Sequence, residues 1–347
     1  MKTVELGRTK MRVSEVGFGG IPISRLTLKE AVELVRHCFD LGLTLFDTAN
    51  MYGDSESKLG QALKPVRDQV VLATKTLARD PETAVQHLKQ SLKSLATDWI
   101  DLYQVHNISD QEDLDRVLAP GGIYEVLDRA RDQGRIRFIG FSSHSPETAL
   151  RAVRTGLFET LQFPFNFIED GPLKELFPAA QEMGLGLIGM KPLGGGLLER
   201  ADLCFKYLQA HSEVVPIPGL ETKAEAEEIV GFYQSPQPLS EADQRAIEAI
   251  RDRLGSSFCR RCGYCQPCPE GIEIPMVLIF KSSSRRLSPN WVISTSQERM
   301  AKVENCQDCG QCQEKCPYDL PIPDLLKEML GCYREFCQKH SAEAPAT

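Results

Sequence analysis

The sequence predicts an α/β protein: a closed (β/α)8 TIM barrel followed by a small, mainly α-helical domain rich in cysteine. Three observations lead to this prediction. Strand-like and helix-like stretches alternate through the first ~255 residues, which is typical of parallel sheets. Eight strand candidates occur there, as many as a closed barrel of roughly 250 residues uses. Only two of the 12 cysteines precede residue 259. An open doubly wound sheet is the alternative, although its glycine fingerprint is missing after the first strand.

The expected strands are short apolar runs, and helical patterns lie between them. The strands are expected at residues 13–20, 43–48, 70–75, 100–106, 136–142, 160–165, 185–191 and 214–218. The clearest helical patterns cover residues 28–41, 81–96, 123–133, 146–154, 173–183 and 223–232. Thr27, Asp80 and Ser145 are N-cap candidates, and proline follows the last two at the first helical position. Residues 4–13 alternate around a glycine-containing turn, which predicts a hairpin that plugs the far end of the barrel.

The chain changes character near Ser256. Ser240 caps a helix that runs to about Leu254, and Gly255 is its stop signal. We therefore expect the barrel at residues 1–255, the cysteine-rich domain at residues 256–338 and a disordered tail at residues 339–347. Two segments of the cysteine-rich domain, 268–278 and 316–326, align without gaps, which indicates a duplicated module.

Composition narrows the possible functions. The chain has 42% hydrophobic and 25% charged residues, as ordinary globular proteins do. Its net charge of -8 argues against nucleic acid as a partner. No apolar run reaches the ~20 residues that span a bilayer, and the N-terminus lacks the apolar core of a signal peptide, so we expect a cytoplasmic protein. Clustered cysteines in a reducing compartment indicate metal rather than disulfides.

Four titratable residues stand at or just after the ends of three successive expected strands. They are Asp47, Tyr52, Lys75 and His106. If these strands are parallel neighbours, the four side chains converge on one rim. Reducing a carbonyl with hydride requires an acid that protonates the developing alkoxide, and a tyrosine keeps its proton at neutral pH. Lys75 can make that proton easier to give, and Asp47 can anchor Lys75 as an ion pair. His106 can donate a hydrogen bond to the substrate oxygen.

Taken singly, these residues have ordinary readings as a structural ion pair, a rim histidine and a surface tyrosine. Their sequence contexts are Phe-Asp-Thr-Ala-x-x-Tyr-Gly, Ala-Thr-Lys and Asp-Leu-Tyr-Gln-Val-His. In this order they resemble the catalytic tetrad of the aldo-keto reductase family, over about residues 1–255. The resemblance implies NAD(P)(H)-dependent reduction of a small-molecule carbonyl, an aldehyde or a ketone, with Tyr52 as general acid.

The resemblance also implies a dinucleotide site on the same rim. Its residues would be Ser142, Ser143, Gln162, Met190, Lys191, Pro192, Leu193, Gly194, Gly195, Gly219, Lys223 and Glu228. The two serines and Gln162 match positions that hold the nicotinamide carboxamide. Met190 stands where the family usually has a stacking tyrosine, so a thioether contact would have to serve.

Two parts of this site leave alternatives open. The run Gly194–Gly196 could bring backbone amides to the pyrophosphate, or it could be a flexible loop. After the last strand, Glu221 and Glu225 stand where the family usually has basic residues, and only Lys223 is positive. Carboxylates accept hydrogen bonds from a ribose hydroxyl but repel a phosphate, so NAD is as plausible as NADP.

The cysteines form two runs with the spacing of iron–sulfur ligands. The second run, Cys306-x₂-Cys309-x₂-Cys312-x₃-Cys316-Pro317, has the spacing of a bacterial [4Fe-4S] motif. The first run, Cys259-x₂-Cys262-x₂-Cys265-x₂-Cys268-Pro269, is one residue shorter. We expect two clusters, in which the last cysteine of each run binds the cluster of the other run. Zinc is the alternative for paired cysteines.

The helical patterns between the two runs resemble the α-helical ferredoxin domain of respiratory iron–sulfur subunits. The fusion with a reductase barrel also resembles an uncharacterised group of microbial reductases. The clusters could be structural, could sense redox state, or could serve an undetected flavin. A partner could be an electron carrier such as ferredoxin or a flavoprotein, docked by Arg260, Arg261, Arg285 and Arg286, or these arginines could form a solvated face. Two other classes of function remain open for the protein: an iron–sulfur electron-transfer adaptor, or a redox-sensing binding protein, on a non-catalytic barrel.

Overall fold

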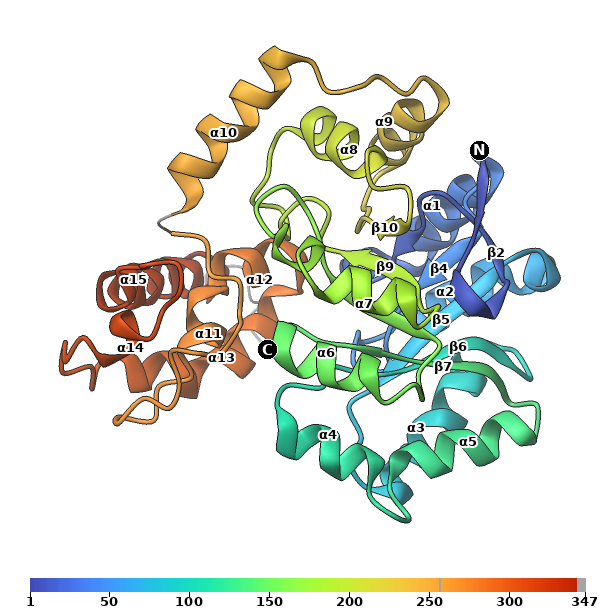
Figure 1. Cartoon of the computed structure of the whole chain (residues 1–347), viewed down its shortest axis with the longest axis horizontal. Coiled ribbons are helices and arrows are strands. Elements are labelled where there is room, and N and C mark those ends of the chain that lie inside the picture. Colours follow the sequence, from blue (N-terminus) through green and yellow to red (C-terminus); the bar gives the residue numbers. More distant parts are fainter. Residues whose placement is uncertain (256, 342–347) are drawn as a thin grey trace. The chain divides into compact units, whose positions relative to one another are not determined.

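The computed structural model describes residues 1–255 and 257–341, and these form two compact units (Figure 1). The first unit comprises Met1–Gly194 and Leu198–Leu239, and the second comprises Gly195–Leu197 and the described residues from Ser240 onward. The boundary differs from the predicted one, because α10 (Glu241–Gly255) groups with the second unit. This helix buries only Ile247, so it has no apolar stripe to pack on a barrel. Ser256 lies outside the described residues.

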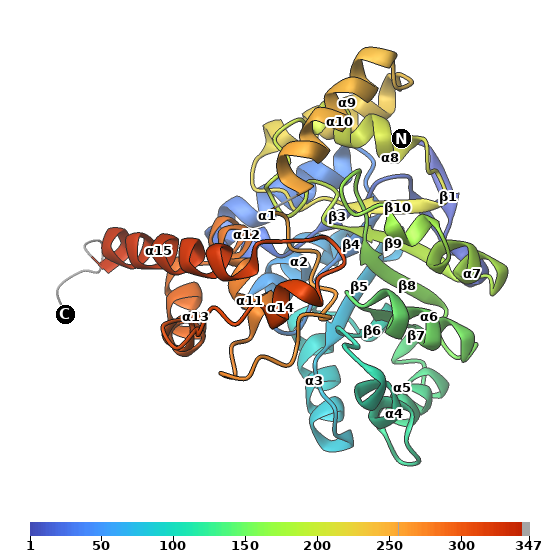
Figure 2. The ribbon, with the colours of Figure 1, turned by 60° about the vertical axis from the view of Figure 1, so that its left-hand side comes forward.

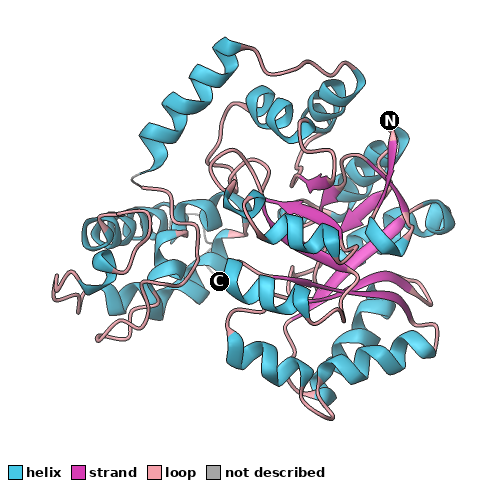
Figure 3. Ribbon diagram, in the orientation of Figure 1, coloured by secondary structure: helices cyan, strands magenta, loops and turns pink. Residues whose placement is uncertain are grey.

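Eight parallel strands form a closed barrel in the first unit (Figure 3). They are β3 (Phe18–Gly19), β4 (Leu45–Asp47), β5 (Val71–Thr76), β6 (Ile100–Val105), β7 (Ile136–Ser142), β8 (Thr160–Pro164), β9 (Gly186–Met190) and β10 (Val214–Ile217). Each strand pairs with its neighbour in chain order. The ring closes where the amides of Gly17 and Gly19 donate to the carbonyl oxygens of Pro216 and Pro218, at 2.9 and 2.7 Å. The predicted barrel is therefore confirmed, and the open sheet is excluded.

Helices follow the strands and surround the barrel (Figures 1 and 2). They are α1 (Leu28–Asp40), α2 (Ser55–Leu63), α3 (Pro81–Ser94), α4 (Gln111–Leu118), α5 (Ile123–Asp132), α6 (Pro146–Arg154), α7 (Leu176–Glu182), α8 (Ala201–Gln209) and α9 (Lys223–Gln234). Thr27, Asp80 and Ser145 each accept a hydrogen bond from the amide three residues later, so the predicted N-caps are confirmed. α7 begins later than predicted, because Gly171–Leu173 form a separate 3-10 turn.

The N-terminal hairpin packs against the interior of the barrel, as predicted. β1 (Thr3–Glu5) and β2 (Arg12–Ser14) pair antiparallel, with a 3-10 turn at Gly7–Thr9 between them. Leu6 and Val13 join a buried cluster of strand residues, namely Leu45, Ala73, Leu102, Ile188, Val215 and Ile217. Because Leu6 lies against Gly186, the first residue of β9, the hairpin covers the amino-terminal end of the strands. The carboxyl ends stay available for a site.

The second unit is helical, as predicted. After α10 it contains α11 (Ile274–Leu278), α12 (Phe280–Arg286), α13 (Pro289–Val303), α14 (Gln311–Glu314) and α15 (Ile322–Ser341). The predicted tail begins at Lys339, but α15 continues through Lys339 and His340, whose positive or titratable side chains suit a helix C-terminus. Residues 342–347 lie outside the described residues. In the described part of the chain, no helix has the length and apolar character required to cross a bilayer.

A carboxylate is buried where α2 packs against β5. Glu56 is 4% exposed, and its Oε1 accepts a hydrogen bond from Thr74 Oγ1 at 2.7 Å. Burial raises the pKa of Glu56, while hydrogen bonding from Thr74 and the charge of Lys75 oppose this rise. Ionised Glu56 is therefore disfavoured in the folded protein relative to the unfolded chain.

We expect Gly186→Ala to destabilise the barrel, because the added methyl group would lie 2.6 Å from Leu6 Cγ. Overpacking of this kind costs about 1–3 kcal/mol, which urea unfolding followed by far-UV circular dichroism measures. Gly231→Ala in α9 is the matched control, since a methyl group there would meet no atom within 4 Å. That substitution should stabilise the helix by about 0.5–1 kcal/mol. Equal urea midpoints for Gly186→Ala and wild type would contradict the close packing.

We expect Glu56→Gln to gain stability relative to wild type as the pH rises from about 5 to about 8. The raised pKa means that the folded state binds more protons than the unfolded state above the ordinary carboxyl pKa, so wild-type stability falls as pH rises through this window. Urea midpoints at both pH values measure the difference. Glu30→Gln is the control. Hydrogen bonds from Thr27 lower the pKa of Glu30, so its contribution to stability changes only below the ordinary carboxyl pKa. Between about pH 5 and about pH 8 the stability of Glu30→Gln relative to wild type should therefore stay constant. A pH-independent effect of Glu56→Gln would contradict the prediction.

Candidate functional site

The candidate active site is built on a buried ion pair at the carboxyl ends of the strands. Asp47 ends β4, and Lys75 lies near the end of β5. Lys75 Nζ lies 2.5 Å from Asp47 Oδ2 and donates to Thr48 O at 2.6 Å. The two side chains are 2% and 4% exposed. Removing one partner from such a pair leaves an uncompensated buried charge, which typically costs about 3–5 kcal/mol.

Two glutamine amides complete the surroundings of Asp47. Gln104 Nε2 and Gln162 Nε2 donate to Asp47 Oδ1 at 3.0 and 3.1 Å. Together with Lys75 they fix the orientation of the carboxylate. The sequence analysis singled out Gln162 as a cofactor residue but missed Gln104. No local sequence signal marks Gln104, because only the register of β5 and β6 shows that it pairs with Lys75.

Tyr52 and His106 lie beside the ion pair. Tyr52 belongs to the turn between β4 and α2, His106 follows β6, and both are half-buried. Lys75 Nζ lies 5.4 Å from the centre of the Tyr52 ring. The Tyr52 and His106 rings meet edge to face, with centroids 5.8 Å apart. The structure thus brings together the four side chains that the sequence singles out, in an arrangement that can transfer a proton to or from a bound molecule.

Ser142 and Ser143 are buried at the end of β7, next to β8. Ser142 Oγ accepts a hydrogen bond from Asn107 N at 2.9 Å, and Ser143 Oγ donates to Ile108 O at 2.7 Å. Both serines therefore hold the loop that follows His106. The sequence analysis missed Asn166, which donates to Lys191 O at 3.0 Å and so connects the loops after β8 and β9. An asparagine just after a strand was the available signal.

The segment after β9 leads from the strand end into a tight turn. Met190 ends β9, Pro192 is buried, and Leu193 is half-buried. Lys191 and Gly194 both have a left-handed φ of 57°. Gly194 N donates to Lys191 O at 2.8 Å, which closes the turn.

The rest of the triglycine run belongs to the second unit. There the carbonyl oxygen of Gly195 accepts a hydrogen bond from Ser282 Oγ at 3.1 Å, and that of Gly196 accepts one from Arg285 Nη1. The contacts recorded for Gly195 and Gly196 engage their carbonyl oxygens. A role of this run in holding a pyrophosphate stays a prediction.

The segment after β10 has an additional cation nearby. Gly219 forms an isolated parallel β-bridge with Gly19, and a methyl group on Gly219 would lie 2.7 Å from Pro22 Cγ. Glu221 forms an ion pair with Arg25 at 3.2 Å. The sequence analysis missed Arg25, because it lies far upstream in the chain.

Of the other residues expected there, Lys223 lies on α9 with its Nζ 3.8 Å from Glu33 Oε2. Glu228 is exposed on the same helix. The described contacts thus place Lys223 beside a carboxylate, and Glu228 faces solvent.

The cysteines of the two runs surround two cavities in the second unit. The smaller cavity, of about 20 Å³, is lined by what we call the first cysteine set: Cys259, Cys262, Cys265 and Cys316. The larger cavity, of about 170 Å³, is lined by the second cysteine set: Cys268, Cys306, Cys309 and Cys312. Each cavity therefore takes three thiols from one run and the fourth from the other run.

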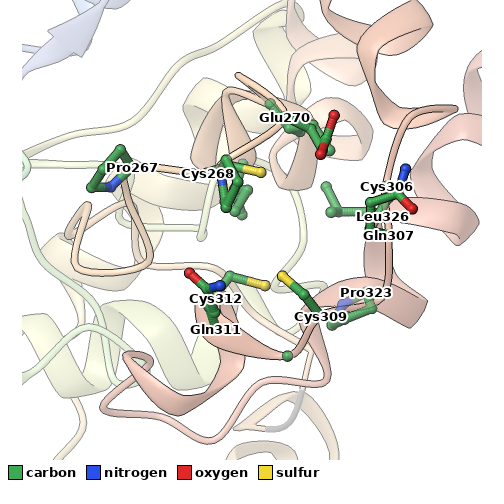
Figure 4. Close-up of a pocket in the computed structure, with 14 residues that line it drawn as sticks. Pro267, Cys268, Glu270, Cys306, Gln307, Cys309, Gln311, Cys312, Pro323 and Leu326 are labelled. Carbon is green, nitrogen blue, oxygen red and sulfur yellow. The ribbon is translucent and has the colours of Figure 1, made fainter.

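The two sets differ in their surroundings. In the larger cavity, Cys268 faces Cys309 and Cys312, and Glu270 lies on the rim (Figure 4). In the smaller cavity, burial raises the pKa of Cys265 to about 12. Within residues 1–255 and 257–341, no three or more His, Cys, Asp or Glu side chains are placed to hold a single metal ion. The thiols of each set surround a space rather than converge on one point.

The sequence matches two protein families in separate regions. The model of the aldo/keto reductase family matches residues 15–203, which is more than half of the 347 residues. The model of a 4Fe-4S dicluster domain matches residues 258–321. This second match favours iron–sulfur clusters over zinc for the two runs of cysteines.

Curated relatives resemble the barrel. The aldo-keto reductase YhdN of Bacillus subtilis is 34% identical over 219 residues, which covers 57% of this chain and 64% of that protein. The probable aldo-keto reductase 1 of Glycine max is 26% identical over 215 residues, which covers 56% of this chain. The chain spans only 60% of the length of that relative.

Solved structures show the same fold. The holo form of the aldo-keto reductase AKR11C1 from Bacillus halodurans has a TM-score of 0.63 at 24% identity and covers 72% of this chain and 96% of that chain. An aldo-keto reductase from Klebsiella pneumoniae in complex with NADPH has a TM-score of 0.60 at 24% identity and covers 72% of this chain and 94% of that chain. A barrel of this fold, with its ion pair and tyrosine at the carboxyl ends of the strands, agrees with the family match over residues 15–203. The chain belongs to the aldo/keto reductase family.

Proposed function

We propose that this protein is an NAD(P)H-dependent oxidoreductase that reduces the carbonyl group of a small aldehyde or ketone. The observation that carries the proposal is the position of Tyr52, half-buried beside the Lys75 ammonium and the His106 ring. A phenol in such surroundings is suited to general acid catalysis.

The donor groups around this site fit a nicotinamide dinucleotide. The Gln162 amide and the Ser142 hydroxyl stand at paired positions of β8 and β7 and suit a carboxamide, whereas Ser143 donates to Ile108 O and supports the loop after His106. Glu221, beside Arg25, suits a ribose hydroxyl, while the two cations Arg25 and Lys223 suit a phosphate, so we propose that both NADH and NADPH bind. When bound, the reduced nicotinamide supplies the hydride.

The protein's own residues handle the proton. Tyr52 gives its phenolic proton to the carbonyl oxygen as that oxygen gains negative charge, and solvent can restore the proton because the side chain is half-buried. The Lys75 ammonium stabilises the phenolate that remains. Asp47 holds Lys75 in place. His106 donates a hydrogen bond to the substrate oxygen, which stabilises the developing charge.

Tyr52→Phe should lower kcat for NAD(P)H-dependent aldehyde reduction by about 10²–10⁴-fold, because it removes the proton donor while keeping the ring. Consumption of NADPH and NADH with a panel of aldehydes measures the loss, and nucleotide binding by fluorescence titration should be unchanged.

The matched control for this experiment is Tyr124→Phe, which removes a hydroxyl that donates to Leu157 O at 2.9 Å, away from the site. Its activity should equal that of wild type. Full activity in Tyr52→Phe would overturn the proposed acid. An electron-transfer adaptor that binds nucleotide without turnover would show no aldehyde reduction even as wild type.

We further propose that each cysteine set holds one [4Fe-4S] cluster. Four thiols around a cavity match the ligand set of such a cluster, and the sharing of the last cysteine between runs is known from two-cluster ferredoxins. When bound, the clusters supply one-electron transfer. A cytoplasmic ferredoxin or flavoprotein is the kind of partner that this module would serve.

Cys316→Ser and Cys262→Ser should each lose about four irons per chain, and the double variant should lose no more than either alone, because both residues belong to the first cysteine set. Combining Cys316→Ser with Cys309→Ser should instead remove about eight irons. Iron and sulfide analysis of anaerobically prepared protein measures both outcomes.

Cys332→Ser is the control, since Cys332 lines neither cavity, and it should keep the wild-type iron content. If Cys316→Ser and Cys309→Ser affect the same cluster, each run binds its own cluster and the exchange of the last cysteine is wrong. Wild-type protein with fewer than about four irons per chain would overturn the cluster proposal itself.

A further inference from the structure

The two cysteine cavities carry opposite charges on their walls. Of the described residues that line the smaller cavity, Arg260 is the one with a formally charged side chain. Its guanidinium carbon lies 3.9 Å from the centre of the Tyr318 ring, which lines the same cavity and so holds the cation in place. Of the described residues that line the larger cavity, Glu270 is the one with a formal charge (Figure 4).

Three further charged residues have recorded contacts near the thiols, and these do not reverse the difference. Asp308 Oδ1 lies 4.0 Å from Cys306 Sγ of the second set, but Lys327 forms an ion pair with Asp308 at 2.8 Å, so the two charges largely compensate. Near the first set, Arg261 Nη2 contacts Met276 Sδ at 3.7 Å, and Arg261 does not line the smaller cavity.

Reduction of a cluster adds one electron, and hence one negative charge, to a site that already has four thiolate ligands. A fixed cation stabilises the reduced form and raises the reduction potential, whereas a carboxylate lowers it. We propose that Arg260 and Glu270 separate the two clusters in potential, so that the cluster of the first cysteine set accepts an electron before the cluster of the second. This inference rests on the proposed iron–sulfur ligation.

The two charges should not act equally. Arg260 is half-buried, whereas Glu270 is exposed and better screened by water. Burial of Cys265 and Cys316 by itself disfavours added negative charge at the first set, and Arg260 is the wall group that offsets this effect. Loss of Arg260 should therefore shift the reduction potential of the first cluster further than loss of Glu270 shifts that of the second.

The test is an anaerobic potentiometric titration of the full-length protein with dithionite as the electron donor, followed by electron paramagnetic resonance. Wild type should show two separate midpoints. Arg260→Gln should lower the higher midpoint and leave the other in place, and Glu270→Gln should raise the lower midpoint by a smaller shift. Arg260→Lys keeps the charge and should stay close to wild type.

Arg245→Gln is the control for loss of one positive charge, because Arg245 lies on α10, is 70% exposed and lines neither cavity. Its midpoints should equal those of wild type. Iron content is measured for every variant, so that a potential is compared only between proteins with the same clusters.

The outcomes separate this inference from the proposal beneath it. Wild-type protein without iron or without a resonance signal would overturn the proposed ligation. Two intact clusters whose midpoints do not move in Arg260→Gln, or move as much in Arg245→Gln, would overturn the role of Arg260 and leave the ligation standing. If Arg260→Gln loses iron, the inference is tested by Glu270→Gln alone. An unchanged lower midpoint in Glu270→Gln would contradict the inference.

Discussion

The buried ion pair of Asp47 and Lys75 is the constraint on which the barrel end depends. Two opposite charges this far from water are stable only while they remain in contact, so β4 and β5 must keep their register. Gln104 and Gln162 reach the same carboxylate from β6 and β8. Four strands of the barrel therefore meet at one acidic side chain, and Tyr52 and His106 are positioned on this rigid base.

The two ends of the barrel interior differ in polarity and in role. The hairpin and the inward-facing aliphatic residues make an apolar plug at the amino-terminal end of the strands. The polar groups gather at the carboxyl ends, where loops reach solvent. Stability and chemistry are thus separated along the barrel axis, as is usual for this fold.

Much of this arrangement was readable from the sequence, because it depends on local pattern. The strand ends at Asp47 and Lys75 and the caps at Thr27 and Ser145 follow from runs of a few residues. Contacts that join distant segments were not readable. Arg25 meets Glu221 only because the barrel closes, and Gln104 resembles any residue of a strand until its neighbour in register is known.

The same reasoning applies to the second unit. Cysteine spacing predicted which thiols gather, since ligand spacing is a local property, but the charges beside them depend on how the loops fold. Arg260 lies in the first cysteine run, and its guanidinium stacks on Tyr318, which follows the second run in the chain. The boundary before α10 was missed because a helix stop signal marks the end of an element and not the end of a compact unit.

The exchange of one cysteine between the two runs also has a consequence for biosynthesis. When the ribosome has released the chain through Cys268, neither cavity has its full complement of thiols, because the first lacks Cys316 and the second lacks three of its members. Both sites become complete only after the whole second run has emerged and folded back. A cluster that binds all four thiols of a set can therefore form only after synthesis has passed Cys312 for the second set and Cys316 for the first.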